Sequence, residues 1–257
     1  MPIIKCKDHI EVYERKARSG DLHELSGRTG RADLTQYVAQ SIAATLPLRS
    51  GDLLVDIGCG DGTLIGLVAD KVASVVGILP TAAEVGRVRP LFSSNERIEI
   101  RQGLSQQTGL PAAIADVVVC NGVFLLLSSS QVDQSFREIA RIGKPGSTAF
   151  IGEVPRVDEF RDRTYGDSIG GWLWWVLRNQ GLGAFATRLR QTLVALLSSE
   201  PMMIGPKAYF FCEPAAFIAL AQAHGLKLQT HFPHPEVATT GENMSSATRW
   251  DYVFVRD

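Results

Sequence analysis

The chain has 257 residues, of which 45% are hydrophobic and 21% are charged, a composition typical of one elaborated soluble globular domain. Lysine and arginine number 26 against 27 aspartate and glutamate, which leaves a formal charge of -1 and excludes the global basic field of a nucleic-acid-binding protein. The longest stretch without a charge, residues 117–132, is too short and too polar to form a transmembrane segment.

Secretion and metal binding are also disfavoured by the sequence. Residues 1–8 contain no apolar run long enough for a secretory signal, and the four cysteines form no CxxC pair. We therefore expect a cytoplasmic protein with reduced thiols. Only His231 and His234 lie close enough in sequence to suggest a ligand pair, and the neighbouring prolines argue against a helical metal site, so no metal is expected.

The order of predicted elements indicates an α/β fold. Two helices are predicted at the N-terminus, over residues 8–18 and 33–46, the second with Asp33 as its N-cap. Strands and helices then alternate, which predicts a parallel sheet covered by helices on both faces. The expected strands are 53–57, 74–79, 97–101, 116–121 and 148–153, and the expected helices are 63–72, 82–92 and 131–142.

The last part of the chain predicts a different ending. A helix over 214–224 leads into strands over 227–232 and 250–255. A loop of about 17 residues is expected between these two strands, which can then pair as an antiparallel hairpin. Such an ending is unusual for a dinucleotide-binding domain.

The first predicted strand of the sheet ends in an acidic residue and a glycine-rich turn, Asp56-Ile57-Gly58-Cys59-Gly60-Asp61-Gly62. Such a turn exposes backbone N–H groups at the start of a helix and lets a polar ligand approach the backbone closely. A nicotinamide site is disfavoured because Thr63 stands where a third spaced glycine is needed. A phosphate-binding loop is disfavoured because no Gly-Lys-Ser/Thr follows. A purely structural turn is the remaining alternative.

Four motifs in this order and spacing resemble class I S-adenosylmethionine-dependent methyltransferases: 55–62, 76–81, 116–121 and 144–146. The resemblance covers about residues 51–153 and resumes at 210–228 and 250–255. It implies a Rossmann-like doubly wound sheet, mostly parallel with an antiparallel C-terminal strand. It also implies S-adenosyl-L-methionine as cofactor and S-adenosyl-L-homocysteine as product. The residues that would bind the cofactor are Asp56, Gly58, Cys59, Gly60, Gly62, Asn121 and Gly122.

Two positions depart from the family pattern. The family usually places an acid at the end of the second strand to hold the ribose, and this chain has Leu79 followed by Pro80. An acid that pairs with adenine is also missing, because Leu104 and Ser105 follow the third strand; Ser105, Gln106 or Gln107 could replace it. We expect Leu79, Pro80, Leu104 and Ser105 to line the cofactor site. The alternatives are a non-catalytic binding module that has lost the cofactor and a protein that takes an altered adenosyl cofactor.

Methyl transfer to a hydroxyl group is assisted by a base, and ligands of such sheets lie beyond the carboxyl ends of the strands. This criterion selects Glu153, His231 and His234 as candidate catalytic residues. The alternatives are solvated histidines beside shaping prolines and a glutamate that caps a helix. We predict a methyltransferase that acts on a small molecule or glycan, with a hydroxyl acceptor favoured. The layout resembles enzymes of secondary-metabolite and surface-polysaccharide biosynthesis.

We predict a single methyltransferase-like domain over residues 1–257. It begins with helices in residues 1–48, and residues 155–206 form a helical insert. Within 168–199 the only charged residues are Arg178, Arg188 and Arg190. Trp172, Trp174 and Trp175 lie close together, and an apolar stripe follows at helical spacing: Phe185, Leu189, Thr192, Leu193 and Leu196. The favoured interpretation is a helical cap that, together with the N-terminal helices, closes over the acceptor. The alternatives are packing on the core or in a homodimer, and peripheral contact of 168–199 with a membrane surface.

Overall fold

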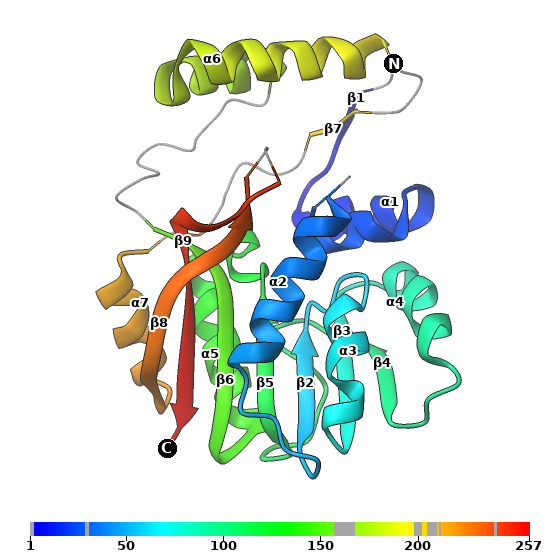
Figure 1. Cartoon of the computed structure of the whole chain (residues 1–257), viewed down its shortest axis with the longest axis vertical. Coiled ribbons are helices and arrows are strands. Elements are labelled where there is room, and N and C mark those ends of the chain that lie inside the picture. Colours follow the sequence, from blue (N-terminus) through cyan, green and yellow to red (C-terminus); the bar gives the residue numbers. More distant parts are fainter. Residues whose placement is uncertain are drawn as a thin grey trace.

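The computed structural model describes residues 3–28, 31–156, 168–197, 202–204, 210, 212–238 and 241–257. At its centre is a seven-stranded sheet in the order β4-β3-β2-β5-β6-β9-β8 (Figure 1). The strands are β2 (Leu53–Ile57), β3 (Ser74–Leu79), β4 (Ile98–Gln102), β5 (Ala115–Asn121), β6 (Gly143–Pro155), β8 (Leu226–Val237) and β9 (Asn243–Arg256). β9 runs antiparallel to both of its neighbours, β6 and β8, and the other six of these strands run in one direction. The predicted doubly wound, mostly parallel sheet with an antiparallel C-terminal strand is confirmed.

Helices cover both faces of the sheet because successive strand residues point to opposite sides. The helices are α1 (His9–Ser19), α2 (Ala32–Thr45), α3 (Thr63–Val68), α4 (Ala82–Val88), α5 (Ser129–Ile142), α6 (Ile169–Leu197) and α7 (Pro214–Gln222). Residues of α2, α3 and α4 pack with Leu54 and Val119 in one core. Residues of α5 and α7 pack with Val55 and Val118 in the other. The two cores leave the strand ends free to form a site.

Several element boundaries differ from the sequence prediction. The predicted helices 63–72 and 82–92 end early and continue as short 3-10 segments, Ala69–Lys71 and Arg89–Phe92. In the second, Pro90 has no N–H to donate to an α-helical bond. Helix α2 begins after Arg31 instead of Asp33, and the Asp33 carboxylate pairs with Arg31 at 3.0 Å. Asp33 therefore lies in the first helical turn and is not the N-cap.

The C-terminal hairpin is longer than predicted, and the expected loop of about 17 residues is wrong. β8 and β9 pair from Leu226 to Arg256 and are connected by residues 238–242. The register shifts between Pro233 and Pro235, where prolines cannot complete the ladder of hydrogen bonds. β8 tolerates them because it is the edge strand of the sheet.

The insert folds as α6, which is interrupted at Gly181, where φ is +83°. It lies apart from the sheet, beyond the carboxyl ends of the parallel strands (Figure 1). Strands β1 (Ile3–Lys5) and β7 (Met202–Ile204) form a separate parallel pair. Residues 157–167, 198–201 and 205–206 of the predicted insert lie outside the described residues. In the part of the chain that the structure describes, no helix has the length and apolar character needed to cross a bilayer.

Candidate functional site

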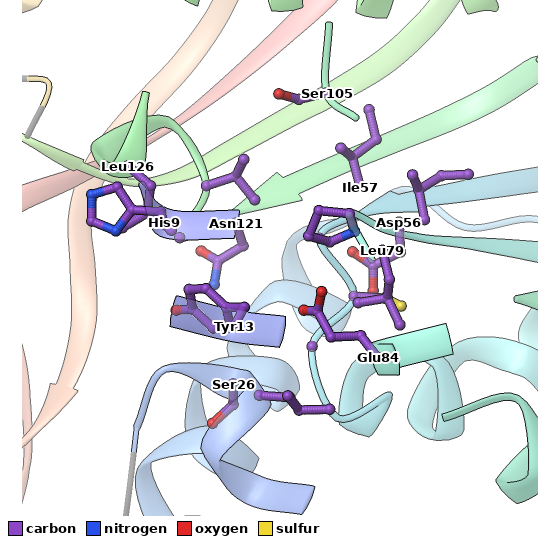
Figure 2. Close-up of a pocket in the computed structure, with 18 of the residues that line it drawn as sticks. His9, Tyr13, Ser26, Asp56, Ile57, Leu79, Glu84, Ser105, Asn121 and Leu126 are labelled. Atoms are coloured by element: carbon purple, nitrogen blue, oxygen red, sulfur yellow. The ribbon is translucent and has the colours of Figure 1, made fainter. Parts of the chain in front are cut away.

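A cavity of about 350 Å³ lies at the carboxyl ends of β2, β3, β4 and β5 (Figure 2). The sheet order reverses between β2 and β5, and this switch point is where open α/β sheets bind ligands. We call it the main cavity. The predicted cofactor residues that line it are Asp56, Gly58, Cys59, Gly60, Leu79, Pro80, Leu104, Ser105, Asn121 and Gly122. Residues far apart in sequence are thus brought to one site.

The glycine turn needs its glycines for conformation and for close packing. Gly58 and Gly60 have positive φ values of +74° and +56°, which L side chains rarely adopt. A Cβ at Gly60 would lie 3.2 Å from the backbone oxygen of Leu25, so the N-terminal segment passes directly over the turn. Gly62 does not line the main cavity; it precedes α3 and lies against the ring of Phe92.

Two buried polar groups in the main cavity lack partners. Asp56 is only 4% exposed, and none of the described residues donates a hydrogen bond to its carboxyl group. Burial, together with the nearby charge of Asp61, raises the pKa of Asp56 to about 7. The side-chain oxygen of Asn121 is buried and has no hydrogen-bond partner in the described part of the chain. Unpaired buried acceptors are costly, so both groups fit a ligand that brings donors or positive charge.

These features fit S-adenosylmethionine, which carries an ammonium group, a sulfonium and hydroxyl donors. Asp56 offers a carboxylate to positive charge, and Asn121 offers an unpaired acceptor at the next strand end. The turn at Gly58 and Gly60 has no side chains that would block approach to the backbone. The residues present are therefore compatible with this cofactor.

Much of the cavity wall comes from the N-terminal segment, whose helices were expected to close over the acceptor although none of their residues was assigned to the site. His9 and Tyr13 of α1 and Ser26 of the 3-10 helix Leu22–Ser26 face the cavity (Figure 2). His23 contacts Asp61 at 3.0 Å, which ties this segment to the glycine turn. Described residues of α6 line neither this cavity nor the second one below, so of the two segments expected to cover the site only the N-terminal helices contribute described residues to its wall.

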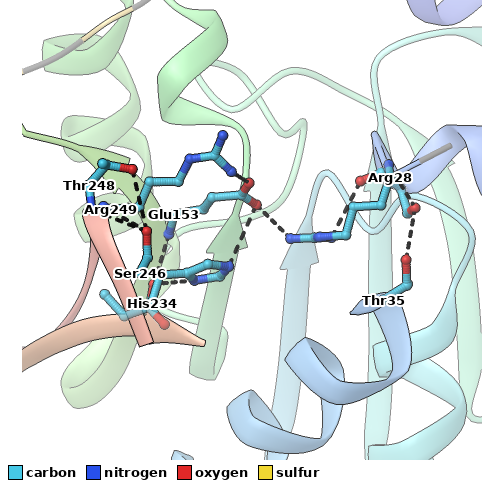
Figure 3. Close-up of polar contacts among 9 residues, drawn as sticks. Arg28, Thr35, Glu153, His234, Ser246, Thr248 and Arg249 are labelled. Carbon is cyan, nitrogen blue, oxygen red and sulfur yellow. Dashed lines mark hydrogen bonds and ion pairs between the residues drawn. The ribbon is translucent and has the colours of Figure 1, made fainter. Parts of the chain in front are cut away.

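A second cavity of about 170 Å³ shares Arg28 with the first. It is lined by Arg28, Leu34, Glu153, His234, Pro235, Glu236, Val237 and Arg249. Figure 3 shows the polar contacts of several residues that line it. The Glu153 carboxylate pairs with Arg28 at 2.5 Å and with Arg249, and its oxygen lies 3.9 Å from Nε2 of His234. A cluster of opposite charges therefore separates the two cavities.

Glu153 is held in an unusual conformation. Its φ is +63°, a value that costs energy in a residue other than glycine and tends to occur at functional sites. Burial alone would raise the pKa of Glu153, but the charges of Arg28, Arg249 and His234 outweigh it and hold that pKa below its usual value. The group is therefore an anion held between two guanidinium groups.

His234 is oriented by a residue that the sequence did not indicate. Nδ1 of His234 lies 2.7 Å from Oδ1 of Asp251, and both side chains are buried. The same Asp251 oxygen accepts a 2.8 Å hydrogen bond from the backbone N–H of Glu153. Its other oxygen, Oδ2, has no partner among the described residues. Asp251 thus links two of the three predicted catalytic residues.

His231 lies away from both cavities. Its ring stacks on Tyr252, with centroids 5.8 Å apart, and packs against Trp250. Its side chain is exposed and does not approach Glu153 or the glycine turn. Within the described residues, no group of three or more histidine, cysteine, aspartate or glutamate side chains could hold a metal ion.

Residues 55–151 match the family model described as "Methyltransferase domain". No curated protein matches the sequence. Similar solved structures include the [4+2]-cyclase SpnF, with 14% identity, a TM-score of 0.62 and coverage of 99% of this chain and 98% of that one.

A chain from the complex between the Haloferax volcanii Trm112 methyltransferase activator and a methyltransferase is 15% identical, with a TM-score of 0.61 and coverage of 98% and 99%. The magnesium protoporphyrin IX methyltransferase ChlM from Synechocystis PCC 6803 with bound SAH is 14% identical, with a TM-score of 0.56 and coverage of 96% and 94%. The predicted resemblance is confirmed at the level of the domain match and the fold: residues 55–151 match a methyltransferase domain, and the chain shares its fold with methyltransferases of known structure, one of them with bound SAH.

Proposed function

We propose that the chain transfers a methyl group from S-adenosylmethionine to a hydroxyl group of a small molecule or glycan. The observation that carries this proposal is that Arg28 lines both cavities. The main cavity contains unpaired hydrogen-bond acceptors that suit the cofactor, and the second cavity contains His234, an imidazole that can accept a proton. The four cysteines of the chain are free, which agrees with a cytoplasmic location. We place the proposed reaction in biosynthesis.

The main cavity supplies the cofactor site in this proposal. Asp56 would accept hydrogen bonds from the ammonium group, and the turn at Gly58, Cys59 and Gly60 would hold the amino-acid part. Leu79, Pro80, Leu104 and Ser105 would form walls around the adenosine, and Asn121 and Gly122 would hold the part of the cofactor that carries the methyl group. Gly62 acts indirectly, by starting α3. When bound, S-adenosylmethionine supplies the methyl group: its carbon–sulfur bond breaks as a carbon–oxygen bond forms, and S-adenosylhomocysteine remains.

The second cavity handles the acceptor's proton. Asp251 holds Nδ1 of His234, which leaves Nε2 to accept the proton that the hydroxyl loses. Glu153 is poorly suited to be the base because Arg28 and Arg249 stabilise its anion. It positions Arg28 at the boundary of the main cavity instead. His231 has no part in this arrangement.

The alternative is a methyltransferase-like binding module without catalysis, for which Leu79 in place of an acid is the main support. Titration calorimetry with S-adenosylmethionine and S-adenosylhomocysteine separates the two. We expect both to bind, and we expect His234→Ala to keep the affinity for S-adenosylhomocysteine while methyl transfer to an acceptor is lost. Absence of binding heat from either compound would overturn the proposed function.

We also propose that α6 contacts an anionic membrane surface. Trp174, Leu193 and Leu197 are exposed on this helix, as are Arg178 and Arg190. Residues 168–197 contain no acid, so positive charge and apolar surface occur together, as in helices that lie on anionic lipid. The side chains of Trp172 and Trp175 lie outside the described part. Sedimentation with anionic vesicles tests this contact, and a homodimer that buries the same surface is the competing outcome.

A further inference from the structure

Glu84 lies in the wall of the main cavity, next to Leu79 (Figure 2), and Pro80 lines the same cavity. β3 ends at Leu79, and Thr81 is the N-cap of α4, so Glu84 in the first helical turn follows the strand end closely. Leu79 itself is buried in the core with Val85. The polar group at this corner of the cavity is therefore carried by the helix and not by the strand.

Glu84 has a structural partner for only one of its two carboxyl oxygens. Oε2 accepts hydrogen bonds from the backbone N–H of Thr81 at 3.2 Å and from its hydroxyl at 2.7 Å. Oε1 receives no hydrogen bond from the described residues. The residue is only 2% exposed, and burial raises the pKa of Glu84 to about 7 although Thr81 opposes this. An oxygen of a buried side chain that faces a cavity and has no donor among the described residues is a binding position for a ligand hydroxyl.

Helix capping alone does not account for a carboxyl group here. The chain has a second capping box, in which Ser128 caps α5 and Gln131 supplies the side chain that reaches back. A neutral amide is sufficient there, and it is exposed to solvent. At Glu84 an acid is kept at a buried position where its ionised form is disfavoured. A ligand that donates hydrogen bonds to this acid would stabilise its ionised form.

We propose that Glu84 accepts the hydrogen bond of a ribose hydroxyl of the adenosyl cofactor, in place of an acid at the end of β3. The inference rests on the proposed function, because it assumes that the main cavity binds this cofactor. A ribose presents two adjacent hydroxyl donors, and a carboxylate is the side chain best suited to accept from them. Leu79 then contributes an apolar wall, and the missing acid is supplied from the following helix.

The test compares S-adenosylhomocysteine with its 2′-deoxy and 3′-deoxy analogues by titration calorimetry. Wild-type protein is expected to bind at least one deoxy analogue about tenfold to a hundredfold more weakly than S-adenosylhomocysteine. Glu84→Gln keeps the acceptor needed for capping but loses the charge. It is expected to bind S-adenosylhomocysteine more weakly by a similar factor and to discriminate little between the compounds.

Two controls keep the result interpretable. Thr81→Ala removes the cap and leaves the carboxyl group, so it should lower the melting temperature while preserving the discrimination. Glu84→Asp keeps the charge on a shorter side chain and should retain part of the discrimination between S-adenosylhomocysteine and its deoxy analogues. Full discrimination in Glu84→Gln, or none in the wild type, overturns the inference alone. No binding of S-adenosylhomocysteine by the wild type overturns the proposed function as well.

Discussion

Asp251 and His234 form a buried pair, with Nδ1 of the imidazole 2.7 Å from Oδ1 of the carboxylate. The pair brings together β9 and the edge strand β8, and it holds the imidazole in one orientation. Nε2 is thereby directed to the side of the ring where Glu153 and the second cavity lie. The arrangement makes Asp251 a positioning residue in the proposed function.

Asp251→Asn is expected to lower kcat for methyl transfer about tenfold to a hundredfold, with little change in KM for the cofactor. Asparagine keeps an oxygen at the position that accepts from the backbone N–H of Glu153, but it lacks the negative charge that stabilises the imidazolium formed when His234 takes up the proton. Steady-state kinetics across pH check this, because the pH profile should change along with kcat. His234→Ala combined with Asp251→Asn should lose no more than His234→Ala alone. Additive losses would show that Asp251 does not act through His234.

Gly122→Ala should impair activity by moving Glu153. A Cβ at this position would lie 2.9 Å from Oε2 of Glu153, the oxygen that pairs with Arg28. Gly146→Ala is the matched control, since Gly146 has a similar φ of +77° against +68° and no atom within 4 Å of the added Cβ. Both variants should lose about 1–2 kcal/mol of stability from backbone strain. Only Gly122→Ala should lose methyl transfer; equal activity in the two variants would contradict this prediction.

The sheet and glycine turn were predictable because their signals are local. An apolar run that breaks into glycines fixes β2, the turn and α3 within a dozen residues, and β3 and β5 begin and end within one residue of prediction. The ends of these strands meet at one edge, so Asp56 and Asn121 could be assigned to one site before the structure.

The acid–base cluster could not be predicted in the same way. Arg28 and Glu153 are 125 residues apart, and no sequence pattern links them. His231 and His234 were both expected at the strand end, but residues three apart in a strand point to opposite faces. The register of β8 against β9 places His234 beside Asp251 and leaves His231 on the aromatic side. Which of the two histidines faces Asp251 depends on the pairing of β8 with β9, which the local sequence does not determine.

Arg28→Ala should cost about 3 kcal/mol of stability, because it leaves the buried Glu153 anion with less compensation. Arg31→Ala is the control from the same segment, since Arg31 pairs with Asp33 on the surface and solvent screens that pair. Urea denaturation should therefore show a clear loss for Arg28→Ala and no measurable change for Arg31→Ala. Similar losses of stability in the two variants would mean that water reaches Glu153 and screens its charge.

The protein without ligand should lose stability as pH rises from about 4.5 to about 7. Glu84 and Asp56 hold their protons in the folded state until about pH 7, whereas the unfolded chain releases them near the ordinary values of 4.5 and 3.8. In this range the folded state binds more protons, so stability falls with increasing pH and levels off above it. Glu84 contributes on the order of 3 kcal/mol.

Glu84→Gln should remove that part of the pH dependence and stabilise the protein at pH 8. Urea denaturation of the wild type and the variant at pH 5 and pH 8 measures the two free energies of unfolding. Glu138 is the control of opposite sign: its hydrogen bonds with Arg141 and Thr108 outweigh burial and lower the pKa of Glu138, so Glu138→Gln should destabilise at pH 8. An unchanged pH dependence in Glu84→Gln would show that Glu84 is solvated.

Leu193→Ser should weaken sedimentation of the protein with anionic vesicles if α6 contacts a membrane. Leu193 is 51% exposed and belongs to the helix that carries Trp174 and the arginines. Leu91→Ser is the matched control, because Leu91 is equally exposed but follows α4, away from α6. Vesicles without anionic lipid should bind less, since the arginines then gain no electrostatic attraction. If both serine variants sediment like the wild type, α6 does not supply the contact. Light scattering tests the homodimer: a mass that rises with protein concentration, and no longer does so in Leu193→Ser, would assign this surface to a dimer interface.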